Sequence, residues 1–258
     1  MMNNYSNLNI FFATIVAVVF MTVSVASYAG QGEIDFLSDD FYEDDFNLTE
    51  TRDPLEPLNR VAFTVNDYLY TWILDPVATS YSELFPTSIR ECVSNFFNNL
   101  KEPVRFVNAL LQGRFSDSGR AMSRLIINST LGVYGFGDAA TLEFDIKPIE
   151  ATLGQTMASW GIGDGFYLVV PFYGPSTLRD ITGTVVESFS MTPYYIWTED
   201  IWILGSIYTG KELNRISFRL GEYEDLKKLT LDPYVALRNI YFQYRESIRK
   251  QDSLDIIE

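Results

Sequence analysis

The sequence contains no histidine and a single cysteine among its 258 residues. Histidine is the usual general base near neutral pH and a common metal ligand, so its absence excludes Ser-His-Asp and Cys-His catalysis. One cysteine cannot form an internal disulfide, and we expect Cys92, with Val93 and Phe96 at its side, to be a buried thiol. No spacing singles out a carboxylate pair of the kind that glycosidases use. The sequence therefore favours a protein that is not an enzyme and uses neither metal nor cofactor.

Positive charge is also scarce. Nineteen Lys and Arg residues stand against 34 Asp and Glu residues, which gives a net charge of −15. A strongly acidic surface repels nucleic acid, so no nucleic-acid partner is expected. The glycines of Gly161-x-Gly163-x-Gly165 lack the G-x-x-G spacing of dinucleotide sites, and no Gly-Lys-Ser/Thr follows them, so nucleotide binding is not predicted either.

The N-terminal 52 residues are predicted to lie outside the folded domain. Residues 1–29 are typical of a secretory signal, with an apolar run at 10–25 and small residues at Ser27 and Ala29 where a signal peptidase would cleave. The alternative is an uncleaved N-terminal anchor. Residues 30–52 are rich in Asp and Glu and predict a flexible acidic linker. A segment that docks on a partner is the alternative for this linker.

From residue 53 onward, apolar spacing predicts a chain of helices and few or no strands. We expect a single, mainly α-helical domain at 53–251 and a loose tail at 252–258. The expected helices cover residues 53–74, 86–100, 103–112, 116–131, 150–159, 211–229 and 232–251.

Several details of these helices are open to test. Asp53 is expected to cap the first helix, and Asp75-Pro76 to break or bend it. Its apolar positions, including Leu58, Val61 and Trp72, follow helical spacing. Four arginines give the next third of the chain a basic character, and we expect them on the solvated surface, although arginine also suits phosphate binding: Arg105, Arg114, Arg120 and Arg124.

Aromatic residues are abundant, at 15% of the chain. They gather between Met191 and Tyr208, where two interpretations stay open. The segment is either a helical hairpin in the core or an interfacial segment with its aromatic rings at the depth of lipid headgroups. The second interpretation makes four residues candidates for a membrane interface: Tyr194, Tyr195, Trp197 and Trp202.

The most informative stretch is 160–180. Three glycines at alternate positions precede an apolar run, Phe166 to Val170, and Pro171 and Pro175 follow it. Proline donates no ladder hydrogen bond, so we expect extended or irregular backbone rather than a central strand. Ser176 or Thr177 is placed to cap the next helix. The glycines are either an ordinary turn between helices or a flexible gate.

This stretch resembles the signature of the MlaA/VacJ family. The resemblance extends from residue 53 to residue 247, and its further motifs are Asp-Pro-Leu-Glu-Pro-Leu-Asn-Arg at 53–60, Asn-Phe-Phe-Asn-Asn-Leu-Lys-Glu-Pro at 95–103, Asn-Ala-Leu-Leu-Gln-Gly at 108–113 and Asp-Pro-Tyr at 232–234. It implies a ring-like, membrane-embedded helical body in the outer membrane of Gram-negative bacteria. It also implies that the protein removes mislocalised phospholipid from the outer leaflet, with an outer-membrane porin trimer and a periplasmic lipid carrier as partners.

Within this resemblance, the candidate lipid path or gate comprises Gly161, Gly163, Gly165, Arg179 and Asp180. Most family members are lipoproteins with a cysteine at the cleavage point. This sequence has none there, so attachment is expected to come from the folded body or from a partner. Two other functions compete with lipid transport. One is an adaptor that binds an envelope protein without moving lipid, and the other is a lipid hydrolase, against which the missing histidine counts.

Overall fold

The computed structural model describes residues 53–190 and 201–255. The predicted signal and linker, residues 256–258 of the predicted tail, and Tyr194, Tyr195 and Trp197 lie outside these ranges. The helical elements are α2 (Glu56–Leu69), the π-helical turn η2 (Tyr70–Leu74), α3 (Asp75–Leu84), α4 (Thr87–Asn99), α5 (Glu102–Leu111), α6 (Phe115–Thr130), α7 (Ala139–Phe144), α8 (Leu153–Ser159), α9 (Leu178–Ser190), α11 (Ile201–Ile216), α12 (Glu222–Leu229) and α13 (Pro233–Asp255).

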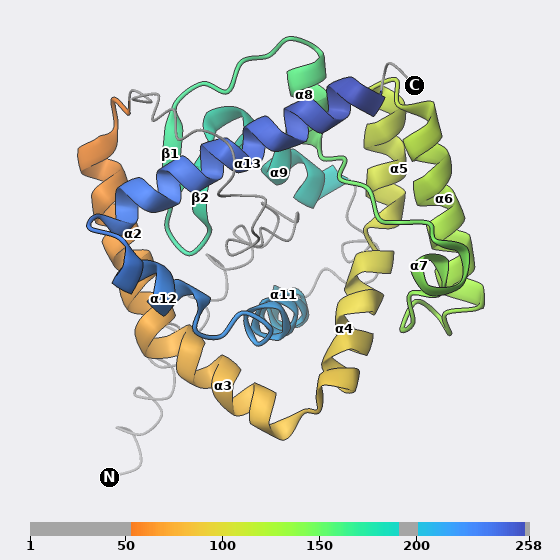
Figure 1. The fold of residues 1–258 in the computed structure, drawn as a ribbon, viewed down its shortest axis with the longest axis horizontal. Helices are drawn as coiled ribbons and strands as arrows, with labels where there is room; N and C mark the ends of the chain where they lie inside the picture. The colour runs from red at the N-terminus through yellow and green to blue at the C-terminus, as the bar shows by residue number, and fades with distance from the viewer. Residues whose placement is uncertain (1–52, 191–200, 256–258) are drawn as a thin grey trace.

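The helices are arranged as a ring (Figure 1). Helices α2 to α6 follow one another around its circumference, α13 runs along one side, and α11 lies within it, seen end-on. The strands described form one antiparallel hairpin of β1 (Tyr167–Val170) and β2 (Gly174–Thr177), with Tyr167 opposite Thr177. The prediction of a mainly helical, ring-like body with few strands is confirmed.

Proline and glycine set many of the helix ends. Helix α13 begins at Pro233, and the Asp232 carboxylate accepts the N–H of Tyr234 at 3.0 Å, as the sequence predicts for a cap. Helix α5 ends at Leu111, and Gly113 follows with φ of 76°. Helix α13 continues to Asp255, so it includes the first residues of the predicted tail.

Two expected boundaries are wrong. Helix α2 begins at Glu56, and Asp53 lies before the helix, where its carboxylate accepts the N–H of Leu55 at 3.0 Å. The expected interruption at Asp75-Pro76 agrees with the structure, because the wider η2 turn ends at Leu74 and a new α-helix, α3, begins with Pro76 in its first turn. The helix expected at 211–229 is two helices, since Gly221 adopts φ of 90° between α11 and α12.

The outer face of the first helices is apolar. Leu58 is 63% exposed and Trp72, in η2, is 74% exposed, whereas Asn59, on another face of α2, is 1% exposed. Helical spacing places apolar residues on one face, but it does not say whether protein or another apolar medium covers that face. Other large apolar side chains exposed on these helices include Val61, Val65, Ile73, Val77, Leu84 and Ile89.

The buried amides of α2 hold the β-hairpin against this helix. The Asn59 side chain donates to the carbonyl of Tyr167 at 3.0 Å and accepts the N–H of Val169 at 2.9 Å. About two turns further along α2, the Asn66 side chain donates to the carbonyl of Val170 at 3.0 Å. These amides satisfy backbone groups of β1 that β2 does not pair.

An ion-pair cluster joins α5, α6 and the start of α7. The Glu102 side chain is fully buried and accepts hydrogen bonds from Arg105 at 3.2 Å and Arg124 at 2.9 Å. Arg124 also donates to both carboxylate oxygens of Asp138 at 3.1 Å. Buried charges are costly unless they are paired and hydrogen-bonded, and Glu102 is paired with two arginines through Oε1, while its buried Oε2 has no hydrogen-bond partner among the described residues.

The surface prediction for the four arginines is consequently wrong for three of them, because carboxylates on α5 and α6 hold Arg105, Arg114 and Arg124 inside the structure. Arg120 alone of the four is substantially exposed.

The prediction of a buried thiol is also wrong. Cys92 lies on the exposed side of α4, while Arg90 occupies the buried side and donates to the carbonyl of Ser217 at 2.8 Å.

Helix α11 is fixed inside the ring by polar contacts. The buried Asn214 accepts the hydroxyl of Tyr81 on α3 at 2.9 Å and donates to the carbonyl of Arg90 on α4 at 3.1 Å. None of the helices in residues 53–190 and 201–255 has the length and hydropathy of a membrane-crossing helix.

Candidate functional site

A cavity of about 330 Å³ opens inside the ring. Its wall comes from α2 and η2, the β-hairpin, α9, α11, α12 and α13, so residues far apart in the sequence meet there. Four apolar and aromatic side chains on one face of α13 line it: Leu237, Tyr241, Tyr244 and Ile248. Tyr241 also belongs to a core cluster with the buried Tyr167 and Val169, so this face borders both the cavity and the core.

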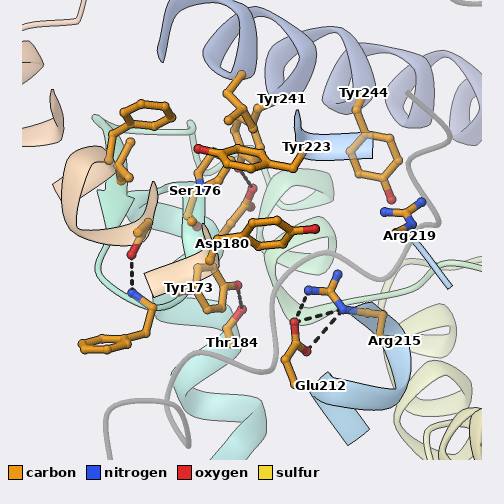
Figure 2. A pocket seen from close by; sticks show the side chains of 18 of the residues that line it. Tyr173, Ser176, Asp180, Thr184, Glu212, Arg215, Arg219, Tyr223, Tyr241 and Tyr244 are labelled. Carbon is orange, nitrogen blue, oxygen red and sulfur yellow. Dashed lines mark hydrogen bonds and ion pairs between the residues drawn. The ribbon is translucent and has the colours of Figure 1, made fainter. Parts of the chain in front are cut away.

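Tyrosines form much of the cavity wall (Figure 2). The rings of Tyr70 and Tyr223 pack with their centroids 4.6 Å apart, and the hydroxyls of Tyr173 and Thr184 lie 3.2 Å apart. Burial raises the pKa of Tyr70 to about 12 and raises that of Tyr173 further. These phenols stay protonated at physiological pH and can donate hydrogen bonds to an anionic group.

Charged groups also project into the cavity from α11. Glu212 and Arg215 form an ion pair one turn apart, with the Arg215 Nε at 3.1 Å from the carboxylate (Figure 2). Burial alone would raise the pKa of Glu212, but the adjacent Arg215 guanidinium together with the nearby Lys211 and Lys101 lowers that pKa overall. Glu212 is therefore ionised. A second pair, Arg219 and Glu222, follows at 3.8 Å where α11 passes into α12.

Asp180 connects two sides of the cavity. Its carboxylate, on α9, accepts the Tyr241 hydroxyl at 2.7 Å and an N–H of Arg245 at 2.8 Å, both from α13. It also accepts the Nε of Arg179 at 3.1 Å. Arg179 reaches in the other direction to Asp164 at 2.6 Å. The α8–β1 connection is thus coupled to the cavity wall through Arg179 and Asp180.

The MlaA lipoprotein family matches residues 51–248. The chain belongs to this family. It is 32% identical over 204 residues to the Escherichia coli protein named intermembrane phospholipid transport system lipoprotein MlaA, covering 76% of this chain and 78% of that protein. The Haemophilus influenzae protein of the same name is 30% identical over 198 residues, with the same two coverages, 76% and 78%.

A solved structure agrees with this assignment. It comes from work on the structural basis for maintenance of bacterial outer membrane lipid asymmetry. The TM-score is 0.62 at 31% identity, and the match covers 77% of this chain and 99% of that chain. The resemblance to the family that the sequence motifs indicate is confirmed.

The candidate gate residues fall into two groups in this family fold. Gly161, Gly163 and Gly165 lie on the α8–β1 connection and do not line the cavity, whereas Asp180 does. Gly161 and Gly165 have φ of 83° and 72°. Gly163 does not have a positive φ, and a Cβ there would meet open space. Arg179 is buried behind the cavity wall and bridges Asp164 to Asp180.

Of the four candidate interface residues, Trp202 is the one that the structure describes, and it is exposed at the start of α11. Sequence reasoning did not select the charged groups of the cavity, Glu212, Arg215 and Arg219. Their spacing is a visible signal, but spacing does not reveal that α11 lies inside a ring. Within residues 53–190 and 201–255, cysteine and acidic side chains form no cluster that could hold a metal ion.

Proposed function

We propose that this protein removes mislocalised phospholipid from the outer leaflet of the outer membrane and passes it through the ring cavity toward the periplasm. The observation that carries the proposal is an apolar outer surface around a cavity that holds charged groups. Apolar side chains cover the outside of α2 to α4, while the cavity wall combines apolar and aromatic side chains with arginines and carboxylates. A contiguous apolar surface is typical of contact with a membrane or a protein partner.

The physical argument concerns the two parts of a phospholipid. Its acyl chains remain in hydrocarbon at little cost, whereas its charged headgroup is expensive to place there. A ring whose outer surface meets lipid, and whose cavity presents arginine, carboxylate and tyrosine groups, gives the headgroup a polar route. No covalent chemistry is required for that step, so we propose a transport protein and not an enzyme.

We further propose that the α8–β1 connection acts as a gate. Gly161 and Gly165 both occupy the left-handed region, and Asp164 between them is paired with Arg179. Because Arg179 also contacts Asp180 in the cavity wall, movement of this connection would alter the wall. Such a connection can bias a route open or shut.

Localisation and partners belong to the same proposal. A secretory signal at residues 1–29 would deliver the chain across the inner membrane, and the apolar outer surface would retain it in the outer membrane without a lipid-modified cysteine. An outer-membrane porin trimer would hold the ring in place, and a periplasmic lipid carrier would receive the cargo. The relatives named as parts of an intermembrane phospholipid transport system support the lipid-transport part of this arrangement.

The test is restoration of lipid asymmetry in a strain that lacks the gene. Leu237 lines the cavity from α13, so Leu237→Trp would fill part of the route. Leu229 is exposed on α12 and does not line the cavity, so Leu229→Trp is the matched control. At equal protein level, we expect the control to clear surface phospholipid and Leu237→Trp to fail. Equal clearance by both variants would reject the cavity as the route and favour the adaptor function.

A further inference from the structure

We propose that the cavity prefers a zwitterionic headgroup, such as phosphoethanolamine, over a headgroup with net negative charge. The preference arises from the two acid–base pairs Glu212–Arg215 and Arg219–Glu222. This inference rests on the proposed function and deepens it by naming the class of lipid that the route accepts.

The balance of charge in the cavity wall is the first support. Four carboxylates line the cavity, on Glu150, Asp180, Glu212 and Glu222, against the three guanidinium groups of Arg215, Arg219 and Arg245. The wall therefore offers no excess of positive charge. A site built for an anionic lipid would need one, because each uncompensated negative charge in a confined space repels the ligand.

The accessibility of the two pairs is the second support. The Arg215 side chain is 45% exposed and its partner Glu212 is 19% exposed, while Arg219 and Glu222 are 23% and 29% exposed. Both signs of charge are thus open to a ligand in the cavity. Asp180 differs, because Tyr241, Arg179 and Arg245 already occupy its carboxylate.

A zwitterionic headgroup can take the place of the partner in each of these ion pairs. Arginine binds phosphate oxygens with strong, charge-assisted hydrogen bonds, and a carboxylate accepts hydrogen bonds from an ammonium group. A zwitterionic headgroup presents both partners two carbons apart. It can therefore replace the partner of each member of an ion pair and leave no charge uncompensated.

A phosphoglycerol headgroup satisfies only half of this arrangement. Its phosphate would contact Arg215 or Arg219, but its glycerol hydroxyls offer no positive charge to the carboxylates of Glu212 and Glu222. The tyrosine rings beside the pairs, Tyr70 and Tyr223 among them, add to the difference. Aromatic faces attract cations, so they favour the ammonium group over a neutral or anionic substituent.

The experiment measures which lipid the purified protein retains. Full-length protein in detergent is incubated with equal amounts of phosphatidylethanolamine and phosphatidylglycerol that carry identical acyl chains, and bound lipid is quantified by native mass spectrometry. We expect the wild-type protein to retain phosphatidylethanolamine in at least about fivefold excess, since one uncompensated charge pair in a partly screened cavity is worth that much in binding.

Two variants and a control sharpen the test. Glu212→Gln with Glu222→Gln removes the repulsion of the anionic lipid, so the ratio should fall to near one. Arg215→Gln should weaken both lipids, because both carry the phosphate, and should weaken phosphatidylglycerol more, because the negative charge of Glu212 then lacks the adjacent guanidinium. Glu91 is exposed on α4 outside the cavity, and Glu91→Gln makes the same chemical change with no expected effect on the ratio. Thermal melting of each variant checks that it is folded.

The wild-type ratio decides the matter even if a variant fails to fold. A wild-type ratio near one, or an excess of phosphatidylglycerol, would overturn the headgroup preference and leave the proposed route intact, provided that Leu237→Trp still blocks clearance. A protein that retains neither lipid, together with full clearance by Leu237→Trp, would overturn both the preference and the route.

Discussion

Charge placed on the apolar outer surface should release the protein from the membrane without unfolding it. The two positions that test this are Trp72 in η2 and Leu84 at the end of α3, which are 74% and 75% exposed. Neither side chain is part of the core, so Trp72→Glu combined with Leu84→Glu leaves the interior contacts of the ring in place.

The magnitude follows from the exposed area. A large aromatic side chain covers roughly 150–250 Å², so the exposed part of Trp72 amounts to about 150 Å². At about 25 cal/mol per Å², its transfer from water to an apolar medium is worth about 4 kcal/mol, and that of Leu84 about 2 kcal/mol. The double change therefore removes about 6 kcal/mol of membrane affinity, before any cost of placing carboxylates there.

The assay is flotation of the purified protein with phospholipid vesicles, alongside circular dichroism. We expect the double variant to stay in the aqueous fraction with an unchanged helical signal and melting temperature. Ser247→Glu adds a charge on the exposed side of α13 and should float like the wild type. If the double variant floats equally well, the outer surface is not the membrane contact. If it unfolds, these side chains are covered in the native protein.

Three further predictions concern the interior. Burial raises the pKa of Glu187 from 4.5 to about 7, so between these pH values the folded protein keeps a proton that the unfolded chain has released. The free energy of unfolding therefore falls by about 3 kcal/mol as the pH rises through that window. Glu187→Gln should melt at a higher temperature than wild type at pH 8 and at the same temperature near pH 4.5, and equal melting temperatures at both pH values would contradict the shift. Arg124→Met leaves the buried Glu102 short of a cation and should cost about 3–5 kcal/mol in urea unfolding, whereas a loss under 1 kcal/mol would show that the pair contributes little. A Cβ on Gly183 would lie 2.6 Å from the backbone of α8, so Gly183→Ala should lower the melting temperature, while Gly163→Ala, which meets open space, should leave it unchanged.

Local features of the fold are predictable from the sequence. The cap at Asp232 and the helix end at Gly113 depend on neighbouring residues alone, and both are confirmed. The extended backbone before Pro171 also follows from the neighbouring prolines. The pairing of this segment with residues 174–177 as a hairpin does not follow from local sequence. The family resemblance adds the ring, because it depends on motifs spread along the whole chain.

Features that depend on the surrounding medium or on distant partners could not be predicted. The apolar stripe of α2 has helical spacing whether it faces protein or lipid, so spacing alone does not place Leu58 and Trp72 on the outer surface. Arg124 appears as surface charge until α5 brings Glu102 beside it, 22 positions away along the chain. Glu212 and Arg215 look like a solvated i,i+3 pair, and only their position inside the ring makes them part of a cavity.

The central claim is that phospholipid headgroups enter the cavity. A photo-crosslinking phenylalanine analogue in place of Tyr244 would sit in the cavity wall, and the same analogue in place of Ser247 would sit on the exposed side of the same helix. In cells whose lipids carry radioactive phosphate, illumination should label the protein with phospholipid at position 244 and leave it unlabelled at position 247. Absence of a lipid adduct at 244, with the protein folded and in the outer membrane, would contradict passage through the ring.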